Sequence, residues 1–279
     1  MNAPAGWLGR LELEFESVAR GTQLSRSEHE GPLRIQRVLE PEGPECPHVY
    51  LLHPPGGVVG GDRLETRVSL RCGARVLLTT PAAQKLYRSA GQSAEISSVL
   101  SLAEGASLEF LPSETLAFPA AQARSATRVE LAPGAAFIGW DIACYGMPAR
   151  GEVFDRGHVL SRFELYRSSA PLAIEAFELG GASDVRDGAF GLRGQPVVGN
   201  LYAVPRGSVI EDSLVDQVRE TLDVRPTELC SVSSLGELLV VRALGRSVES
   251  VRARLVEAWQ VLRPALLSRP AVLPRVWAT

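Results

Sequence analysis

The sequence has few of the residues that bind transition metals tightly or carry out thiol chemistry. Its 279 residues include four cysteines and four histidines, with no C-x-x-C, H-x-H or H-E-x-x-H motif among them. These absences argue against a zinc knuckle, a dithiol redox pair and a metal centre built from local spacing. We expect each cysteine to be a buried free thiol. The eight residues are Cys46, Cys72, Cys144, Cys230, His29, His48, His53 and His158.

Long apolar runs and an excess of charge of one sign are also missing. No stretch approaches the ~20 apolar residues that cross a bilayer, and the net charge is −3 at pH 7 without a basic run. We therefore expect neither a membrane segment nor binding to nucleic acid. Residues 1–10, MNAPAGWLGR, lack the charged start and apolar stretch of a secretory signal, which predicts a cytoplasmic protein.

Lysine is nearly absent. Lys85 is the single lysine, and the other 28 basic residues are arginine. A bias of this kind makes the one lysine a candidate for a role that needs a compact ammonium group instead of a planar guanidinium. Chance retention is the alternative.

Alternation of apolar and polar residues dominates the first two thirds of the chain. Leu11–Phe15, LELEF, has the period of two that predicts a strand with one buried face. Similar short runs predict a mainly β fold; they cover Val49–Leu52, Leu64–Leu70, Arg75–Thr79, Ile96–Leu102, Ser107–Leu111, Thr127–Leu131, Ala136–Ile142, Val159–Tyr166 and Leu172–Leu179.

A short segment, Leu-x-x-Gly-Ala, recurs within this region at residues 70–74, 102–106 and 131–135. Each copy follows an alternating run and precedes an apolar one, and its glycine suits a turn with positive φ. Recurrence near every ~30 residues predicts stacked strand–turn–strand layers, as in a solenoid-like or helix-like β fold. The alternative is ordinary hairpin turns in a β-sandwich.

The composition changes after about residue 205. Ser208–Glu211 is a capping-box pattern that predicts the start of an amphipathic helix. Two strands are expected around Gly236, and a second helix is expected to begin near Ser247 and to end at Arg263–Pro264, because proline cannot continue it.

This pattern predicts a β-strand stack over residues 1–205. A small C-terminal α+β appendage with two helices follows over residues 206–279, and we expect the two parts to pack as one domain. The tail, Pro270–Thr279, is expected to be irregular.

The densest motif is HPPGGVVGGDR at residues 53–63. Its glycines and prolines predict a tight turn with unusual backbone angles. Phosphate binding is not favoured, because G-K-[ST] and G-x-G-x-x-G are both missing and strands are expected on both sides. The residues of interest are His53, Gly56, Gly57, Gly60, Gly61 and Asp62.

A second polar segment, LLTTPAAQKLYRS at residues 77–89, ends a predicted strand. Its Lys85, Tyr87 and Arg88 can approach Asp62 in some arrangements of the chain. General acid–base catalysis needs a positioned carboxylate or histidine pair, and no Ser-His-Asp or Cys-His arrangement is visible. A lone histidine beside glycine turns, as His53 is, is more often a hydrogen-bonded structural residue than a ligand.

Together these two segments resemble the signature of the urease accessory protein D (UreD, also called UreH) family. The resemblance continues along nearly the whole chain, through GASLEFLPSETLAF at 105–118, GAAFIGWDIACYG at 134–146, GEVF at 151–154 and LLVVRALG at 238–245, to WQVLRP and PRVWAT near the end. Two departures are Phe110, where the family has tryptophan, and CYGMPARGE, where it more often has G-R-P.

The resemblance implies an all-β protein with a helix-like strand stack and a few helices. It implies a non-enzymatic chaperone of metalloenzyme maturation in nitrogen metabolism, with no tightly bound cofactor. The implied partners are urease accessory protein F directly, the accessory GTPase G through F, and the urease apoprotein. Nickel is implied to pass transiently, as Ni²⁺, through the body of the protein toward urease.

A carrier that must release nickel is better served by carboxylates, carbonyls and water than by thiolates and imidazoles. Asp141 is the favoured candidate, because it shares a strand face with Gly139 and Ala143, whose small size leaves room. Further candidates are acids in or beside apolar strand sequence, namely Asp62, Glu109, Glu114, Glu152 and Glu175. For each of them a surface or salt-bridged acid is the alternative.

Two other functions stay open. One is a plain protein-interaction scaffold without a metal path. The other is a β-helix enzyme acting on carbohydrates, which would need paired carboxylates on a concave surface and usually a secretion signal.

Overall fold

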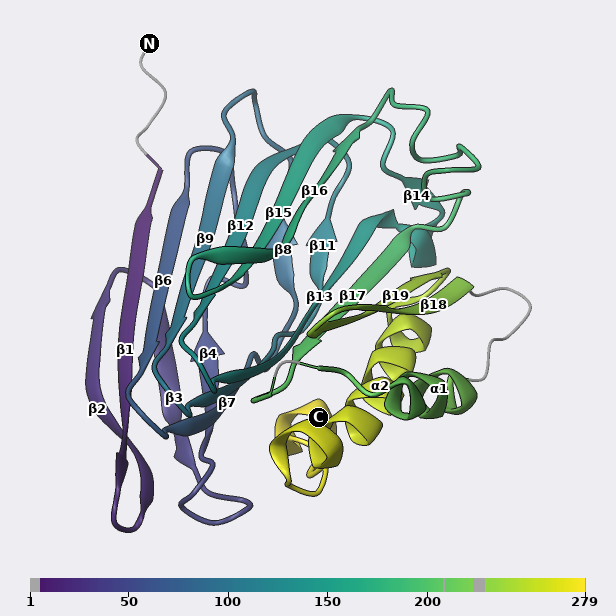
Figure 1. Cartoon of the computed structure of the whole chain (residues 1–279). Helices are drawn as coiled ribbons and strands as arrows, with labels where there is room; N and C mark the ends of the chain where they lie inside the picture. The colour runs from purple at the N-terminus through teal and green to yellow at the C-terminus, as the bar shows by residue number, and fades with distance from the viewer. Residues whose placement is uncertain (1–5, 208, 223–228, 279) are drawn as a thin grey trace.

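Two β-sheets face each other in the computed structural model of the chain, and two helices cover the outer side of one of them (Figure 1). The structure describes residues 6–207, 209–222 and 229–278. The seven-stranded sheet runs, from edge to edge, through β16 (Ala170–Gly180), β15 (Gly157–Arg167), β12 (Ala121–Leu131), β9 (Ala94–Leu102), β6 (Arg63–Leu70), β1 (Leu8–Val18) and β2 (Gly21–Glu30).

The larger sheet is completed by strands from both ends of the chain. Its main path runs through β18 (Leu229–Leu235), β19 (Leu238–Gly245), β17 (Val197–Val204), β13 (Ala136–Met147), β10 (Ser107–Leu111), β7 (Arg75–Thr79), β4 (His48–Leu52) and β3 (Arg34–Leu39). Four short strands attach to it, namely β5 (Gly57–Val58), β8 (Gln84–Leu86), β11 (Thr115–Ala117) and β14 (Glu152–Val153).

The chain passes back and forth between the sheets, and this winding creates the helix-like stack. It runs from β6 to β7, from β9 to β10 and from β12 to β13, each time crossing from the seven-stranded sheet to the larger one. Within each sheet, these strands lie parallel to their counterparts in the next layer. The mainly β, solenoid-like fold that the sequence predicts is therefore confirmed.

The repeated Leu-x-x-Gly-Ala segment forms the turn at each crossing. Gly73, Gly105 and Gly134 have φ angles of +71°, +66° and +69°, in the left-handed region that glycine adopts without steric cost. The N–H of Gly73 donates to the carbonyl of Glu104 in the next layer at 3.0 Å, so the turns stack. The flanking leucines are register partners and the alanines are fully buried; they are Leu70, Leu102, Leu131, Ala74, Ala106 and Ala135.

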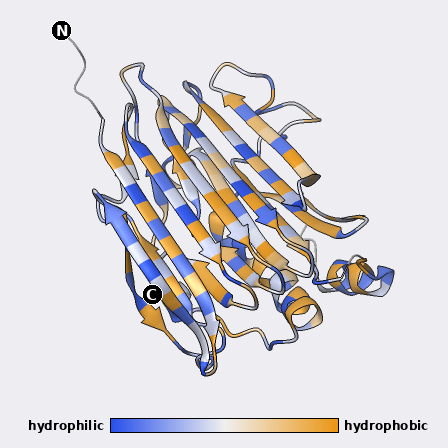
Figure 2. Ribbon diagram, turned by 60° about the vertical axis from the view of Figure 1, so that its left-hand side comes forward, coloured by the Kyte–Doolittle hydropathy of each residue, from blue (hydrophilic) through white to orange (hydrophobic). Residues whose placement is uncertain are grey.

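The two sheets enclose one apolar core and the helices enclose a second. Figure 2 shows the alternation of hydropathy along the strands. In β1, Leu11, Leu13 and Phe15 point into the core between the sheets, because successive side chains of a strand point to opposite faces. On its other face, the larger sheet is covered by α1 (Asp212–Thr221) and α2 (Val248–Leu267). The molecule is a stack of sheet, sheet and helices.

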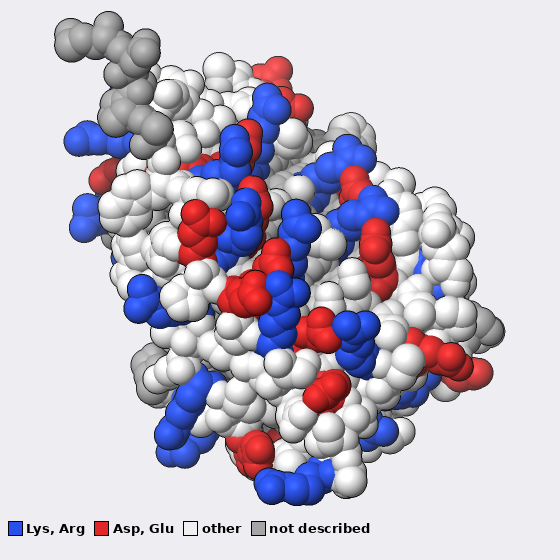
Figure 3. Space-filling view, turned by 90° about the vertical axis from the view of Figure 1, so that its left-hand side faces the viewer, with Lys and Arg blue, Asp and Glu red and all other residues white. Residues whose placement is uncertain are grey.

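The outer face of the seven-stranded sheet is charged. Arginine and acidic side chains interleave over the face shown in Figure 3. Arg10 of β1 pairs with Glu65 of β6 at 3.2 Å, and Arg128 of β12 pairs with Glu164 of β15 at 2.8 Å. Exposed ion pairs of this kind contribute little to stability, so the stability of the fold comes mainly from the two cores.

The second helix is longer than the sequence predicts. α2 begins after Ser247, as expected, and the Ser247 side chain caps its first turn. It continues through Pro264 to Leu267, so the predicted end at Arg263–Pro264 is wrong. The proline lies in the last turn, where it removes a single backbone donor. Ser268, in the left-handed region, then closes the helix, and its N–H bonds to the Pro264 carbonyl at 3.1 Å.

Two further expectations concern the ends of elements. α1 begins at Asp212, and the predicted capping residue Ser208 lies outside the described residues. The tail contains a 3₁₀ turn, η2 (Arg275–Ala278), where irregular chain was expected. Another 3₁₀ turn, η1 (Pro148–Arg150), follows β13.

The strands of the C-terminal appendage join the sheet of the body. β17, which lies before residue 205, pairs with β13 on one side and with β19 on the other. The division at residue 205 stays a prediction about the sequence. Within the described ranges, no helix is both long and apolar enough to cross a membrane.

Cys46, Cys72 and Cys144 are free thiols, and the four cysteines differ in burial. Cys46 and Cys144 are buried, Cys230 is half-buried, and Cys72 is exposed. The expectation of burial is therefore wrong for Cys72, which lies in the turn between β6 and β7. Burial raises the pKa of the Cys144 thiol to about 11, so this thiol is protonated at pH 7.

Candidate functional site

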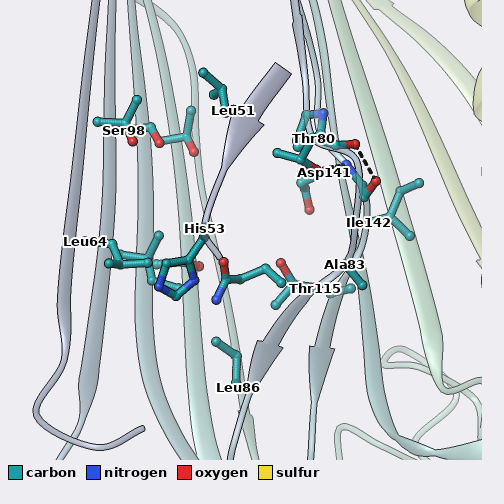
Figure 4. Close-up of a pocket in the computed structure, with 18 of the residues that line it drawn as sticks. Leu51, His53, Leu64, Thr80, Ala83, Leu86, Ser98, Thr115, Asp141 and Ile142 are labelled. Carbon is teal, nitrogen blue, oxygen red and sulfur yellow. Dashed lines mark hydrogen bonds between the residues drawn. The ribbon is translucent and has the colours of Figure 1, made fainter. Parts of the chain in front are cut away.

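A cavity of about 550 Å³ lies between the two sheets. Most of its lining is apolar, with hydroxyl groups, His53 and Asp141 among the polar exceptions. Figure 4 shows Leu64 and Ser98 on one wall and Thr80, Thr115 and Asp141 on the opposite wall. The cavity therefore occupies the middle of the core that joins the sheets.

Small hydroxyl side chains explain why the core is hollow here. Thr66, Ser98 and Thr127 are register partners on β6, β9 and β12, and all three line the cavity. Ser125 and Ser161 form a second such pair on β12 and β15. These side chains are shorter than the leucines elsewhere in the core, so they leave space and supply neutral hydrogen-bonding groups.

Sequence reasoning did not find this hydroxyl wall, although a signal was present. Ile96, Leu100 and Leu102 of β9 occupy the inward positions, and Ser98 interrupts that apolar row. A polar residue at an inward position of an alternating strand marks either a structural partner or a polar space.

A second space opens from the cavity. A groove of about 610 Å³ lies between β16 and the part of the larger sheet formed by β17, β19 and β18. The groove and the cavity share five lining residues, namely Asp141, Ala143, Tyr145, Ser161 and Phe163. Asp141 therefore lies where the interior cavity meets the groove.

The alternation along β13 aims Asp141 at this junction. Ile138, Trp140 and Ile142 pack beneath the helices, so Asp141 and Ala143 face the other sheet. The sequence predicted this division. The space beside Asp141 comes from Ala143, because a side chain at Gly139 would lie 2.3 Å from the Phe137 ring.

Asp141 belongs to a row of polar residues on neighbouring strands. Asn200 of β17 is its register partner, and Arg242 of β19 is the partner of Asn200. The Asn200 amide donates to Asp141 Oδ2 at 3.3 Å. Burial raises the pKa of Asp141 to about 6, and the nearby Glu175 carboxylate adds to this, while Asn200 and Arg242 oppose it.

Glu175 approaches the same row from the opposite sheet. It lies on β16, and the hydroxyl of Tyr202 donates to its Oε2 at 3.0 Å. The guanidinium of Arg242 forms an ion pair with its Oε1. Both Asp141 and Glu175 line the groove. The structure thus places these two candidate acids at the same groove. Three further residues at this contact, Asn200, Tyr202 and Arg242, were not singled out from the sequence.

Asp62 holds the glycine-rich loop. Its Oδ1 accepts the N–H of Trp7 and its Oδ2 accepts the N–H of Val59, each at 2.9 Å. Both oxygens are therefore bound by backbone donors that connect the loop to the start of β1. The structure does not place Asp62 in the lining of the cavity or of the groove.

The two halves of the motif that runs from His53 to Ser89 touch each other. Gly57 of β5 pairs with Lys85 of β8, and a side chain at Gly57 would lie 2.4 Å from the Tyr87 ring. A side chain at Gly60 would meet Ser89 at 2.1 Å. Gly56 and Gly61 have positive φ angles of +73° and +94°. The backbone of Arg88 forms an isolated antiparallel β-bridge with Ala121.

His53 lines the cavity, together with Pro54 and Gly56 of the same glycine-rich loop. Burial lowers the pKa of its ring, while a hydrogen bond with the Gln84 side chain opposes this shift. The ring is therefore neutral at pH 7 and does not add a positive charge to the cavity.

The other three candidate acids lie away from the junction. Glu109 is buried beneath α2, where Trp259 Nε1 donates to it at 2.7 Å and Arg263 Nε at 2.9 Å. Glu114 pairs with Arg252 of α2, and Glu152 is exposed on β14. None of the three lines the cavity or the groove, and their part in a metal path stays a prediction.

The junction lacks the ligand set of a tight metal site. In the described part of the chain, no three side chains of His, Cys, Asp or Glu gather closely enough to hold a metal ion. Two carboxylates with amide, phenol and hydroxyl oxygens suit a hydrated divalent cation without the strong bonds of thiolate or imidazole ligands.

Comparison with known proteins adds the family. The family model described as UreD urease accessory protein matches residues 8–278. A urease accessory protein UreD from Alcanivorax borkumensis is 40% identical, over 98% of this chain and 93% of the relative. UreD 2 from Brucella anthropi is 41% identical, over 98% and 99%. The UreD protein from Pseudomonas fluorescens is 41% identical over all of both chains.

These matches extend over both sheets and both helices, and they define the class as an accessory protein of urease. The chain belongs to the UreD family.

Proposed function

We propose that this chain passes Ni²⁺ between its two β-sheets during urease maturation, through the junction at Asp141 and Glu175. The observation that carries this proposal is that Asp141 lines both the interior cavity and the groove. A half-buried carboxylate at the point where two spaces meet is suited to guide a cation from one to the other.

The chemistry of the lining supports transfer over storage. The hydroxyls of Thr66, Ser98 and Thr127 can bind the water shell of a cation without replacing it. A divalent cation that keeps its water shell binds the lining weakly and dissociates from it readily. Transient Ni²⁺ is in this view the cargo of the protein, and no tightly bound cofactor is part of the proposal.

The remaining parts of the proposal concern assembly. The chain acts as a non-enzymatic chaperone in the cytoplasm, binds accessory protein F directly and the accessory GTPase G through F, and docks on the urease apoprotein. Support for these partners comes from family membership together with the resemblance of the sequence motifs.

The substitution Asp141→Asn tests the path. It keeps the shape of the side chain and removes its charge. We expect the nickel content of urease, co-expressed with this chain and accessory proteins F and G, to fall roughly tenfold, which corresponds to ~1.4 kcal/mol in a transfer barrier. The complex with accessory protein F should form as before, because Asp141 lies inside the protein.

Asp216→Asn is the matched control. Asp216 is an exposed residue of α1 that pairs with Arg219, so its change should leave nickel content unaltered. Wild-type nickel content in the Asp141→Asn variant would leave a plain scaffold as the better description of the protein.

A further inference from the structure

Arg242 occupies the entrance to the carboxylate pair. Its guanidinium forms the ion pair with Glu175 across the gap between the sheets, and its positive charge counteracts the rise in the pKa of Asp141. The side chain is 46% exposed, so it reaches in from the solvent side of the groove. Asp141 lies in the same register row, two strands away from Arg242 and one strand beyond Asn200.

The Glu175 carboxylate therefore already has a counter-ion when no metal is present. An arginine side chain stays protonated at all physiological pH values. Because Arg242 is attached to β19, its charge remains close to Glu175 whatever the concentration of the protein. A divalent cation that approaches Glu175 meets a fixed positive charge at contact distance, and charges of like sign repel strongly where water is partly excluded.

We infer that Arg242 competes with divalent cations for the Glu175 carboxylate. Its guanidinium must release Glu175 before a divalent cation can bind there. This inference rests on the proposed function, since it concerns the same junction. We call this ion pair between Arg242 and Glu175 the lock. The lock keeps abundant cations such as Mg²⁺ out of an oxygen-ligand site that would otherwise accept them. It also keeps nickel affinity low, so that cargo is not retained.

The surroundings allow the guanidinium to leave. About half of the side chain already contacts solvent, so it can turn outward without opening either apolar core. Glu175 stays in place when this happens, because the hydroxyl of Tyr202 holds its other oxygen. The site thus changes from a neutralised to a charged carboxylate by the rotation of one side chain.

Cation binding by the isolated chain tests the inference. Titration of Ni²⁺ and of Mg²⁺ into the wild type and into Arg242→Gln, followed by calorimetry, should show that the variant binds both cations about tenfold more tightly, a change of ~1.4 kcal/mol. Arg63→Gln is the control, because Arg63 makes a similar exposed pair with Glu95 on the outer face of the seven-stranded sheet. Its affinity should equal that of the wild type.

A second measurement uses the unaltered protein, in case Arg242→Gln does not fold. Phenylglyoxal modifies accessible arginines, and mass spectrometry locates the modified residues. Saturating Ni²⁺ should speed the modification of Arg242 several-fold, relative to Arg63, because the cation displaces the guanidinium from Glu175.

Two results would overturn the lock. Equal or weaker cation binding by Arg242→Gln would show that the arginine does not compete, and so would an unchanged or slower modification of Arg242 with Ni²⁺ present. A normal nickel content of urease made with Asp141→Asn is a different failure, since it would remove the path itself. Low nickel content with Asp141→Asn, together with unchanged binding in Arg242→Gln, would refute the lock alone.

Discussion

At the scale of single residues, Asp141 is a half-buried acid whose carboxylate is hydrogen-bonded to the neutral amide of Asn200. Its pKa of about 6 in the folded protein lies well above the value of 3.8 for an ordinary aspartate. The folded state therefore binds the proton more tightly than the unfolded chain does. Between about pH 4 and pH 6 the folded form is protonated while the unfolded form is ionised, and above pH 6 both are ionised.

This difference predicts how stability depends on pH. The folded state loses stability, through this group, as the pH rises from about 4 to 6, and the full cost of up to about 2–3 kcal/mol is present above pH 6. Asp141→Asn should remove that cost. Urea unfolding at pH 4 and pH 7.5 should show the variant to be more stable than the wild type at the higher pH and equal to it at the lower. An advantage of the same size at both pH values would contradict the burial of the charge.

Arg263 is the opposite case, a buried charge that is fully paired. Its guanidinium lies between Glu109 and Glu42, with Nη2 bonding to Glu42 Oε1 at 2.6 Å. His48 Nε2 lies 2.6 Å from the same oxygen. Burial alone would raise the pKa of Glu42, but the hydrogen bonds from His48 and Arg263 lower it to about 2.

Removal of Arg263 would take the cationic partner from the buried Glu109 and would leave Glu42 with only His48 and Arg269. We expect Arg263→Met to lower the free energy of unfolding by about 3–5 kcal/mol, measured by urea denaturation at pH 7. Arg219→Met, at an exposed position on α1, should change it by about 0.5 kcal/mol or less. A loss below 1 kcal/mol in Arg263→Met would mean that the core reorganises around the acids.

At the scale of elements, the stacked glycine turns set the geometry of the layers. A side chain at Gly105 would meet nothing closer than 3.9 Å, so its cost would be conformational and not steric with neighbours. The positive φ of +66° makes alanine unfavourable there by about 1–2 kcal/mol.

We therefore expect Gly105→Ala to reduce stability by that amount and Gly105→Asn to reduce it less, because asparagine tolerates the left-handed region. Equilibrium unfolding in urea distinguishes the two variants. Equal losses for alanine and asparagine would point to a packing defect that the space around Gly105 does not show.

Sequence patterns predicted the repeating elements better than the elements that join them. Strands with clean alternation and the Leu-x-x-Gly-Ala turns were predicted, since both signals are local. β2, β3 and β17 were not, because β2 and β3 carry many exposed polar residues and β17 is buried along most of its length. Such strands do not alternate, and their pairing depends on neighbours far away in the sequence.

At the scale of the whole molecule, register decides which acids can share a site. Glu109 and Asp141 look alike in the sequence, since both lie within apolar strands. In the structure Glu109 is the register partner of Ile138, which packs beneath the helices, whereas Asp141 lies three positions further along and faces the other sheet. A single strand pattern cannot show this difference.

The approach of Glu175 to Asp141 was equally invisible to sequence reasoning. Each acid was a candidate by itself, but they come from different sheets and meet only because β16 closes over β17 and β19. Asn200, Tyr202 and Arg242 belong to the same contact. Their roles follow from the way the two sheets are opposed, and no local motif encodes that.

The stacked turns limit how a gene for this protein can change in length. Insertion of one residue into β9 or β12 would reverse the two faces of the strand beyond it, so the hydroxyls of Ser98 or Thr127 would turn outward and charged residues would enter the cavity. Duplication of a complete layer, turn and both strands, would preserve the glycine ladder and lengthen the hydroxyl-lined space instead. Viable insertions and deletions should therefore cluster in connections outside the stack, such as the segment between β16 and β17, and be rare inside the strands that wall the cavity.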